Sequence, residues 1–515
     1  MLFNDTDAYK LIEGASYSLQ TNPDPELERY LDGIIAFVAS AQEKDGYLTT
    51  YKTDRPRPQP GGLAKPGPKS GDLELQGSHE LYNSGHLFES AYAHFRATGK
   101  RSLLDIALRN AVSSTARSAP GKRLTPPGHQ IVETGLFKLA EVTRGTTGSS
   151  RGSSSTSAAM RPATQSSTAT TTRTRLPRRS RTRPSATRFA RPTCTRRWST
   201  SRALEDDPLY REATERIWTD VVGTKLYLTG GLGSRHEQAG ELLSLPNRTA
   251  YAETCASIAS VYRNQRLFSQ SGDAKYVDVL ERTLYNAAIA GVSLSGDLFY
   301  PNPLESDAVQ VQPGSADLQP WFDCSCCPTN LARFLPSPPD YVYATRGASV
   351  YVNLFVASEA SFDLDGGRVI FAQATGYPWT AALFASRPTG RARSRSTSAS
   401  RAGPATSRCR ARFYRYVASS PGAPKLAVNG EPVPIAPAKG YAVLARTWKP
   451  GDVVASTFRW NRARWSPTTE SRTTVARWLS SAGRSSTAPR SGQRRERPRA
   501  RLADDAAVQA KRRTF

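Results

Sequence analysis

The stretch AYAETCASIASVYRNQRLFSQSGDAKYVDVLERTLYNAAIAGVSL at residues 250–294 predicts two consecutive helices. Apolar residues recur at three- and four-residue spacing, and the Ser-Gly-Asp sequence at 271–273 separates the two runs as a helix end followed by a new N-cap would. Helices of similar length in succession favour antiparallel pairs closed into an α/α barrel or toroid. An α-solenoid is the alternative, but we find no fixed-period repeat. The same helical pattern recurs at residues 8–21, 25–43, 79–99, 102–118, 128–145 and 206–228.

From about Tyr341 the pattern changes to that of β-strands. Four segments alternate in polarity or are rich in β-branched and aromatic residues, and turn residues such as Asn429-Gly430 lie between them. We therefore expect a helical region first and a β-sandwich second. The four segments are residues 348–362, 367–379, 423–435 and 439–460.

The formal net charge of +26 over 515 residues would normally indicate a nucleic acid or an anionic surface as partner. The charge is confined to three segments, however. Residues 145–204 contain 13 Arg and no acidic residue, and residues 387–412 contain 8 Arg and no acidic residue. Residues 462–515 carry 14 basic and 4 acidic residues, so the rest of the chain is mildly acidic.

These three segments consist mainly of Arg, Ser, Thr, Pro, Ala and Gly. Disordered basic linkers or RNA-binding tails are one interpretation. The edges are abrupt, however, and the composition is that of a GC-rich gene translated out of frame. We therefore hypothesise frameshifts, which resequencing of the gene would test.

The N-terminal sequence MLFNDTDAYKLIEGASYSL has neither a basic n-region nor an apolar h-region, so it does not predict a secretory signal. No apolar run in the sequence is long enough to span a bilayer. The expected compartment is the cytoplasm. A start codon assigned too far downstream would hide an export signal.

Four cysteines lie outside the Arg-rich segments: Cys255, Cys324, Cys326 and Cys327. In a reducing compartment, clustered thiols indicate a metal or catalysis more often than disulfides. Together with Glu253, three of them would satisfy a tetrahedral Zn²⁺. The spacing differs from the paired C-x₂-C motifs of zinc fingers, and plain buried thiols are the alternative.

Glu237 lies in the Gly-rich sequence GGLGSRHE, sixteen residues before Glu253. A loop carboxylate beside a metal-activated thiolate could act as the general acid/base in a displacement at an anomeric carbon. Taken alone, Glu237 is more simply interpreted as a solvated loop carboxylate.

The motifs GGLGSRHE (230–237), YAETCAS (251–257), FYPNPLES (299–306) and DCSCCPTN (323–330) together resemble glycoside hydrolase family 127, the zinc-dependent β-L-arabinofuranosidases of the DUF1680 type. The resemblance extends to DTDAYKLIEGASYSL, DGYLTTY, HELYNSGHLFESAYAHF and GHQIVETGLFKLAEVTRG in the N-terminal half. It covers about residues 5–144 and 205–385, with weaker traces to about 460. Each motif alone is weak, but their joint order is specific.

The resemblance implies a retaining glycosidase with an (α/α)₆ barrel followed by β-sandwich domains. It implies zinc ligands at Glu253, Cys255, Cys326 and Cys327, with Cys326 as nucleophile and Glu237 as acid/base. Cys324 has no role in this scheme, and His86 and His94 are expected to be helix-face or core residues. The residues expected to hold the sugar hydroxyls are His79, His129 and Tyr300, each of which could equally be a packed helix residue.

We expect the catalytic barrel at residues 1–340, the β-sandwich at 341–461 and an aberrant basic tail at 462–515. The expected substrate is an oligosaccharide that bears β-L-arabinofuranose, although the exact sugar is open. Neither nucleic acid nor a membrane is expected as partner, and a homodimer is compatible with the sequence.

The sequence departs from the family pattern at residues 145–204, where relatives carry further barrel helices and a substrate-binding His. The family's lead-in before DTDAYK is also missing. Loss of barrel helices would expose apolar core surface, and the resulting cost could exceed a net stability of about 5–15 kcal/mol. Two alternatives therefore accompany the glycosidase: a catalytically inactive, frame-damaged member of the family, and, more remotely, a basic nucleic-acid-binding protein.

Overall fold

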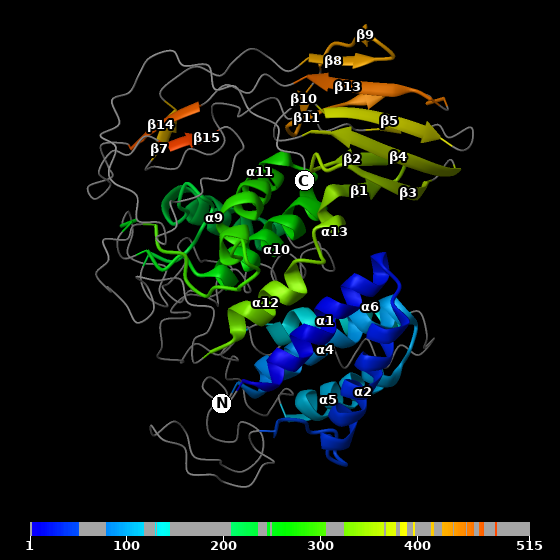
Figure 1. Cartoon of the computed structure of the whole chain (residues 1–515), viewed down its shortest axis with the longest axis vertical. Helices are drawn as coiled ribbons and strands as arrows, with labels where there is room; N and C mark the ends of the chain where they lie inside the picture. The colour runs from blue at the N-terminus through cyan, green and yellow to red at the C-terminus, as the bar shows by residue number, and fades with distance from the viewer. Residues whose placement is uncertain are drawn as a thin grey trace.

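The computed structural model combines helices and antiparallel sheets (Figure 1). Helices form two groups joined by α12, and a six-stranded sheet lies beyond them. Mixed helical and sheet content, with helices first, was predicted and is confirmed. The described residues are 3–50, 79–117, 129, 131–144, 208–234, 245–247, 250–304, 324–364, 367–376, 382–388, 395–396, 414–416, 425–435, 437–446, 448–449, 451–457, 463–467 and 479–481.

The first helical group has its own hydrophobic core. Amphipathic faces meet around fully buried side chains such as Phe88, Leu103 and Ile12. Asp24 caps the second helix by accepting hydrogen bonds from two backbone N–H groups, and Pro25 follows at the first helical position. All five helices were predicted from their periodicity. They are α1 (Asp5–Thr21), α2 (Pro25–Ala41), α4 (Glu80–Thr98), α5 (Ser102–Arg117) and α6 (Ile131–Arg144).

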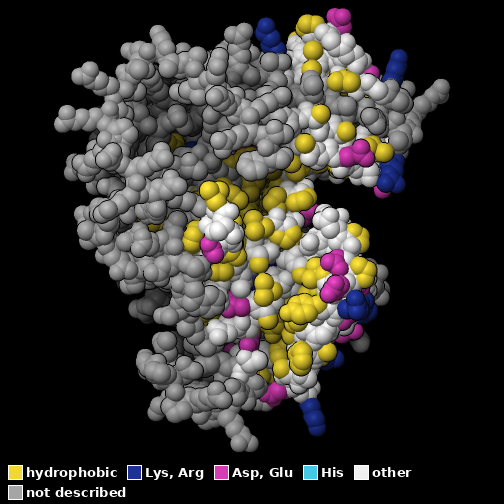
Figure 2. All heavy atoms as spheres, viewed as in Figure 1, with side chains coloured by type: hydrophobic (Ala, Val, Ile, Leu, Met, Phe, Trp, Pro, Cys, Tyr) yellow, Lys and Arg dark blue, Asp and Glu magenta, His cyan; other side chains and the backbone are white. Residues whose placement is uncertain are grey.

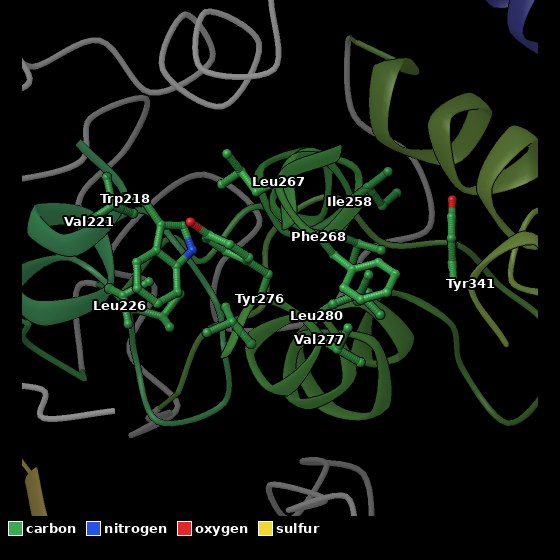
Figure 3. Packing of buried hydrophobic residues seen from close by; sticks show 14 of the residues in the cluster. Trp218, Val221, Leu226, Ile258, Leu267, Phe268, Tyr276, Val277, Leu280 and Tyr341 are labelled. Atoms are coloured by element: carbon green, nitrogen blue, oxygen red, sulfur yellow. The ribbon is translucent and has the colours of Figure 1, made fainter. Parts of the chain in front are cut away.

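The second helical group encloses a larger core, shown in Figure 3. Trp218 packs edge-on against Tyr276, and its indole N–H donates to Asn264 at 2.8 Å. The strong periodicity of residues 250–294 thus gives a helix pair, α10 and α11, as predicted. The elements of the group are α9 (Pro208–Thr224), α10 (Thr254–Ser271), α11 (Ala274–Thr283), η3 (Leu284–Ala288), η4 (Ile289–Gly291), α12 (Cys326–Phe334) and α13 (Pro339–Val342).

The main sheet has the strand order β3-β4-β5-β13-β8-β9, with all neighbours antiparallel. Asn429 and Gly430 join β8 to β9 with positive φ at both residues, as a type I′ hairpin turn requires, so the predicted turn is confirmed. The sheet strands are β3 (Ser358–Leu364), β4 (Gly367–Thr375), β5 (Ala382–Pro388), β8 (Lys425–Val428), β9 (Glu431–Pro432) and β13 (Val453–Thr457).

Shorter strands form separate two- and three-stranded sheets. They are β1 (Tyr343–Arg346), β2 (Ser349–Val352), β6 (Arg395–Ser396), β7 (Tyr414–Tyr416), β10 (Pro437–Ala438), β11 (Tyr441–Ala442), β12 (Leu444–Ala445), β14 (Ala463–Pro467) and β15 (Leu479–Ser481). The Arg-rich segment 145–204 lies outside the described residues, as do most of 387–412 and 462–515.

Helices α1 and α12, about 320 residues apart in sequence, pack tightly against each other. An added Cβ at Gly14 would lie 2.4 Å from the Ala332 carbonyl oxygen, so only glycine permits this approach. At the adjacent residues, the Arg333 guanidinium donates to the Glu13 carboxylate at 2.9 Å in a buried ion pair. This contact fixes the direction of α12 relative to the first helical group.

On the face shown in Figure 2, Lys and Arg side chains are interspersed with Asp and Glu over the part of the chain that the structure describes. Large exposed apolar side chains include Tyr30 and Phe37 on α2. Among the described helices we find none with both the length and the apolar character needed to cross a bilayer.

Gly14→Ala should lower the free energy of unfolding by at least about 2 kcal/mol, because the new methyl group meets backbone that cannot move aside. Urea denaturation measures the change. Gly33→Ala is the matched control: Gly33 lies in α2 with no atom within 4 Å of an added Cβ, so this variant should gain about 0.5–1 kcal/mol from helix propensity. A Gly14→Ala protein as stable as the parent would contradict the packing described.

Candidate active site and metal centre

Glu253, Cys255, Cys326 and Cys327 lie together, and their ligand atoms are all within 4.8 Å of one another. The Sγ atoms of Cys255 and Cys326 are 3.9 Å apart, and Cys327 Sγ is 3.3 Å from Glu253 Oε1. A zinc ion with sulfur bonds of about 2.3 Å requires sulfur–sulfur edges of about 3.8 Å in a tetrahedron. Both the spacing and the donor set therefore fit a zinc-type metal, and the cluster could hold one.

Two helix N-termini deliver these side chains. Glu253 is the N-cap residue of α10, and Cys255 lies in its first turn. Cys326 and Cys327 are the first two residues of α12. The partial positive charge of a helix N-terminus favours anions and lowers the pKa of thiols placed there. The fold thus points two such ends at one buried anionic cluster.

Residues 299–302 hold the segment that leads into α10. The Thr254 N–H donates to the Tyr300 carbonyl oxygen at 3.0 Å, and the Thr254 hydroxyl donates to the Phe299 carbonyl oxygen at 2.9 Å. The Asn302 amide donates to the same hydroxyl at 2.9 Å. This clamp places the Tyr300 hydroxyl 3.4 Å from Cys326 Sγ, so a predicted substrate-binding residue lies against the predicted nucleophile.

The Gly-rich sequence that precedes Glu237 also contacts the segment leading into α10. The Gly233 carbonyl oxygen accepts hydrogen bonds from the N–H groups of Tyr251 and Ala252, at 3.0 and 2.9 Å. Gly233 has a φ of 108°, a conformation that disfavours any residue with a Cβ. Glu237 itself lies outside the described residues, so its role as acid/base stays a prediction.

His79 and His129 lie together, with ring centroids 5.2 Å apart. Tyr82 lies beside both rings, 5.9 Å from His79 and 4.6 Å from His129. His79 has a φ of 56°, which is uncommon for a residue other than glycine and is often retained at functional sites. By contrast, His86 and His94 are buried within α4, as expected for core residues.

Asp7 on α1 is a residue that sequence reasoning missed. Its carboxylate accepts hydrogen bonds from the Ser325 hydroxyl and, at 3.0 Å, from the Thr329 hydroxyl. Ser325 immediately precedes Cys326, so Asp7 ties the start of α12 to α1. In the sequence, Asp7 looks like a carboxylate that stabilises the N-terminus of its own helix through the helix dipole. No local pattern links it to a motif about 320 residues away.

Lys10, one turn further along α1, was also missed. It is 1% exposed, and its ammonium lies 5.5 Å from the centroid of the Tyr82 ring. Burial alone would lower the pKa of Lys10, but attraction to Tyr82 and to the sulfurs of Cys326 and Cys255 raises it. The signal available in the sequence was a lysine at a core-facing position of the predicted helix.

The thiols of the cluster differ in acidity. Burial disfavours the thiolate of Cys255, but hydrogen bonds from Cys326 and Cys327 outweigh it and lower the pKa of Cys255. Burial and the neighbouring sulfurs raise the pKa of Cys327. Contact with Cys326, together with burial, raises the pKa of Cys324. Among these three thiols, Cys255 is therefore the most readily deprotonated in the metal-free protein.

Comparison with known proteins shows the family to which this fold of helices followed by antiparallel sheet, with a Glu/Cys₃ cluster at two helix ends, belongs. Residues 1–340 match the family described as "Beta-L-arabinofuranosidase, GH127 catalytic domain", and residues 349–459 match its middle domain. The chain therefore belongs to the β-L-arabinofuranosidase family GH127.

Individual relatives agree with this assignment. The chain is 31% identical over 429 residues to a non-reducing end β-L-arabinofuranosidase of Bifidobacterium longum subsp. longum, a match that covers 74% of this chain and 61% of the relative. The solved GH127 β-arabinofuranosidase BT3674 is 38% identical, with a TM-score of 0.82 over 92% of this chain and 74% of that one. Ara127N-Se, a GH127 β-L-arabinofuranosidase from Geobacillus stearothermophilus T6, is 30% identical, with a TM-score of 0.79 over 92% of this chain and 75% of that one.

In metal-free protein we expect Cys255 to be a thiolate at neutral pH, because its pKa is lowered from the usual 9.0 to about 6. Its absorbance near 240 nm should persist at pH 7 and disappear as the pH falls through the lowered pKa. Cys255→Ser should remove this signal. Cys324→Ser should keep it, since the pKa of Cys324 is raised. Equal thiolate absorbance in both variants would refute the assignment.

Proposed function

We propose that this chain is a retaining glycoside hydrolase that releases non-reducing-end β-L-arabinofuranose, with Cys326 as nucleophile. The observation that carries the proposal is the buried Glu253/Cys255/Cys326/Cys327 cluster with the Tyr300 hydroxyl 3.4 Å from Cys326 Sγ. Membership of GH127 supports it, as do the relatives that bear the name β-L-arabinofuranosidase. The substrate class would be oligosaccharides that end in this sugar.

In the proposed first step, the Cys326 thiolate attacks the anomeric carbon, and the bond from that carbon to the leaving oxygen breaks. Glu237 donates its proton to the departing oxygen. In the second step, water attacks the same carbon, Glu237 accepts a proton from the water, and the carbon–sulfur bond breaks with return of the thiolate. Two displacements at one carbon give net retention.

Glu253, Cys255, Cys326 and Cys327 would hold the metal, for which zinc is our proposal on the basis of the donor set. When bound, zinc would keep the sulfur ligands deprotonated at neutral pH. The chain itself positions the reacting groups. The clamp at residues 299–302 holds the Tyr300 hydroxyl beside Cys326, and α12 fixes the direction of the Cys326 side chain.

His79 and His129 would hold sugar hydroxyls, together with Tyr300. Their proximity to each other supports a shared binding surface, and Tyr82 links this surface to Lys10 on α1. Polar groups with packed rings beside them are typical of sites that orient a small polar ligand.

For the whole chain we propose an (α/α)₆ barrel up to about residue 340 and a β-sandwich over about 341–461. Two helical groups with separate cores, connected through α12, support the barrel. The inactive-member alternative rests on segment 145–204, outside the described residues. The nucleic-acid alternative rests on the same Arg-rich segments.

Purified protein should release 4-nitrophenol from 4-nitrophenyl β-L-arabinofuranoside. Cys326→Ser should lower the rate on the order of 10³-fold or more, because a hydroxyl at this position is not ionised at neutral pH. Cys324→Ser is the matched control, two residues away and outside the four-ligand cluster, and should keep nearly the parental rate. An active Cys326→Ser enzyme would exclude Cys326 as nucleophile. No release by the parent would favour the inactive family member.

A further inference from the structure

Asp7 on α1 contacts the start of α12 but is not one of the proposed metal ligands, reacting groups or sugar contacts. Its carboxylate is half-buried and uses both of its oxygens. One oxygen accepts a hydrogen bond from the Ser325 hydroxyl, and the other accepts one from the Thr329 hydroxyl at 3.0 Å. These two partners are four positions apart and therefore lie on one face of α12, where a single carboxylate can bridge them.

The N-cap residue of α12 is Ser325, and its hydroxyl is used outside its own helix. A serine at this position usually accepts a hydrogen bond from an N–H group of the first turn. Within the described first turn of α12, Ser325 makes no such bond, and its hydroxyl donates to Asp7 instead. The first N–H groups of a helix lack intrahelical partners, so this turn frays unless other groups hold it. A carboxylate on α1 supplies that support.

The two cysteines at the start of α12 move with this turn. The Cys326 sulfur is 3.9 Å from the sulfur of Cys255 and 3.4 Å from the Tyr300 hydroxyl, both of which lie outside α12. Side chains extend about 5–6 Å from a helix axis, so a rotation of about 10° would displace the sulfur by about 1 Å. A misplacement of this size can lower a reaction rate about 10²-fold.

The other hydrogen-bonded and close contacts between α1 and α12 lie near the opposite end of α12. Gly14 approaches Ala332, and Glu13 pairs with Arg333. Arg333 is eight residues after Ser325, which is a rise of about 12 Å along the helix axis. Among the described hydrogen bonds between the two helices, those of Asp7 therefore hold the turn that carries the thiols.

We propose that Asp7 is a positioning residue for the reaction. By holding Ser325 and Thr329, it fixes the rotation of the first turn of α12 and with it the direction of the Cys326 sulfur. In this role Asp7 acts through the helix and not on the substrate itself. This inference rests on the proposed function, and its test separates the two.

The test measures kcat and KM for 4-nitrophenyl β-L-arabinofuranoside. Asp7→Ala should lower kcat about 10- to 100-fold, because the proposed nucleophile is no longer held toward the anomeric carbon. KM should stay within about threefold of the parental value, since the proposed sugar contacts are unchanged. Ser325→Ala should lower kcat about threefold to tenfold, because Thr329 still donates to Asp7. The double variant should be no slower than Asp7→Ala, since both changes remove the same hydrogen bond.

Asp5→Ala is the matched control. Asp5 also lies in the first turn of α1, and its carboxylate also accepts two hydrogen bonds, from the Thr50 hydroxyl and, at 2.9 Å, from the Thr50 N–H. Thr50 lies outside α12. Asp5→Ala should therefore lower the melting temperature as Asp7→Ala does, but keep kcat within about twofold of the parental value.

Cobalt(II) in place of zinc gives a readout that does not depend on turnover. The near-ultraviolet charge-transfer absorbance of a cobalt–thiolate bond reports how many sulfurs bind the metal. The parent and Asp5→Ala should give the same absorbance per bound cobalt. Asp7→Ala should give less, because the first turn of α12 no longer directs Cys326 and Cys327 toward the metal. Loss of packing alone would lower the melting temperature and leave this absorbance unchanged.

Parental kcat in folded Asp7→Ala would overturn the proposal, and so would an equal loss of kcat in Asp5→Ala. Additive losses in the double variant would also contradict it, because Asp7 and Ser325 would then act separately. If Asp7→Ala does not fold, Ser325→Ala decides: parental kcat contradicts the role, and a lower kcat at parental KM supports it. An inactive parent would refute the proposed function, and the cobalt absorbance would then decide the role of Asp7. An inactive parent that binds no cobalt would refute both.

Discussion

The close contact of α1 with α12 is the constraint on which the site depends. Gly14 lets the two backbones touch, the buried pair of Glu13 and Arg333 sets their orientation, and Asp7 holds the first turn of α12 through Ser325 and Thr329. A buried ion pair adds little net stability on average, but breaking one is costly, so such pairs are suited to fixing a single arrangement. Here the contact fixes the orientation of α12, and therefore the direction in which the side chains of Cys326 and Cys327 point.

The second half of the site comes from α10, and the two halves meet only through the fold. Cys255 and Cys326 are 71 residues apart in sequence, yet their sulfurs are 3.9 Å apart. Each lies in the first turn of a helix, where backbone N–H groups and the helix dipole already favour negative charge. The protein thus prepares an electropositive place for anionic sulfur before a metal contributes any charge.

Much of this could be predicted from the sequence, and the limits have physical reasons. Regular apolar spacing identified the helices, and Asn429-Gly430 identified a hairpin turn, because both signals are local. The grouping of Glu253 with three cysteines followed from donor chemistry and motif resemblance. Asp7 and Lys10 were missed because helix packing sets their partners, which no local pattern encodes: Ser325 and Thr329 lie about 320 residues from Asp7, and Tyr82 lies about 70 residues from Lys10. In the sequence they are only polar residues on one face of a predicted helix, and the packing of the folded chain buries this face.

The residues proposed to bind the metal and those proposed to bind and hydrolyse the sugar come from different parts of the sequence. The contacts around the cluster that the structure describes come from residues 5–14, 233, 251–255, 299–302 and 325–333, all outside the Arg-rich segments. The proposed acid/base Glu237 and the proposed sugar contacts depend on a wider part of the chain, including His129, which lies sixteen residues before the first of these segments. Damage in residues 145–204 would therefore act first on substrate binding and proton transfer, while the sulfur cluster retains its own packing. On the proposed function, a chain that binds zinc but turns over slowly would be the physical consequence, and the defect would lie in substrate binding instead of the proposed metal centre.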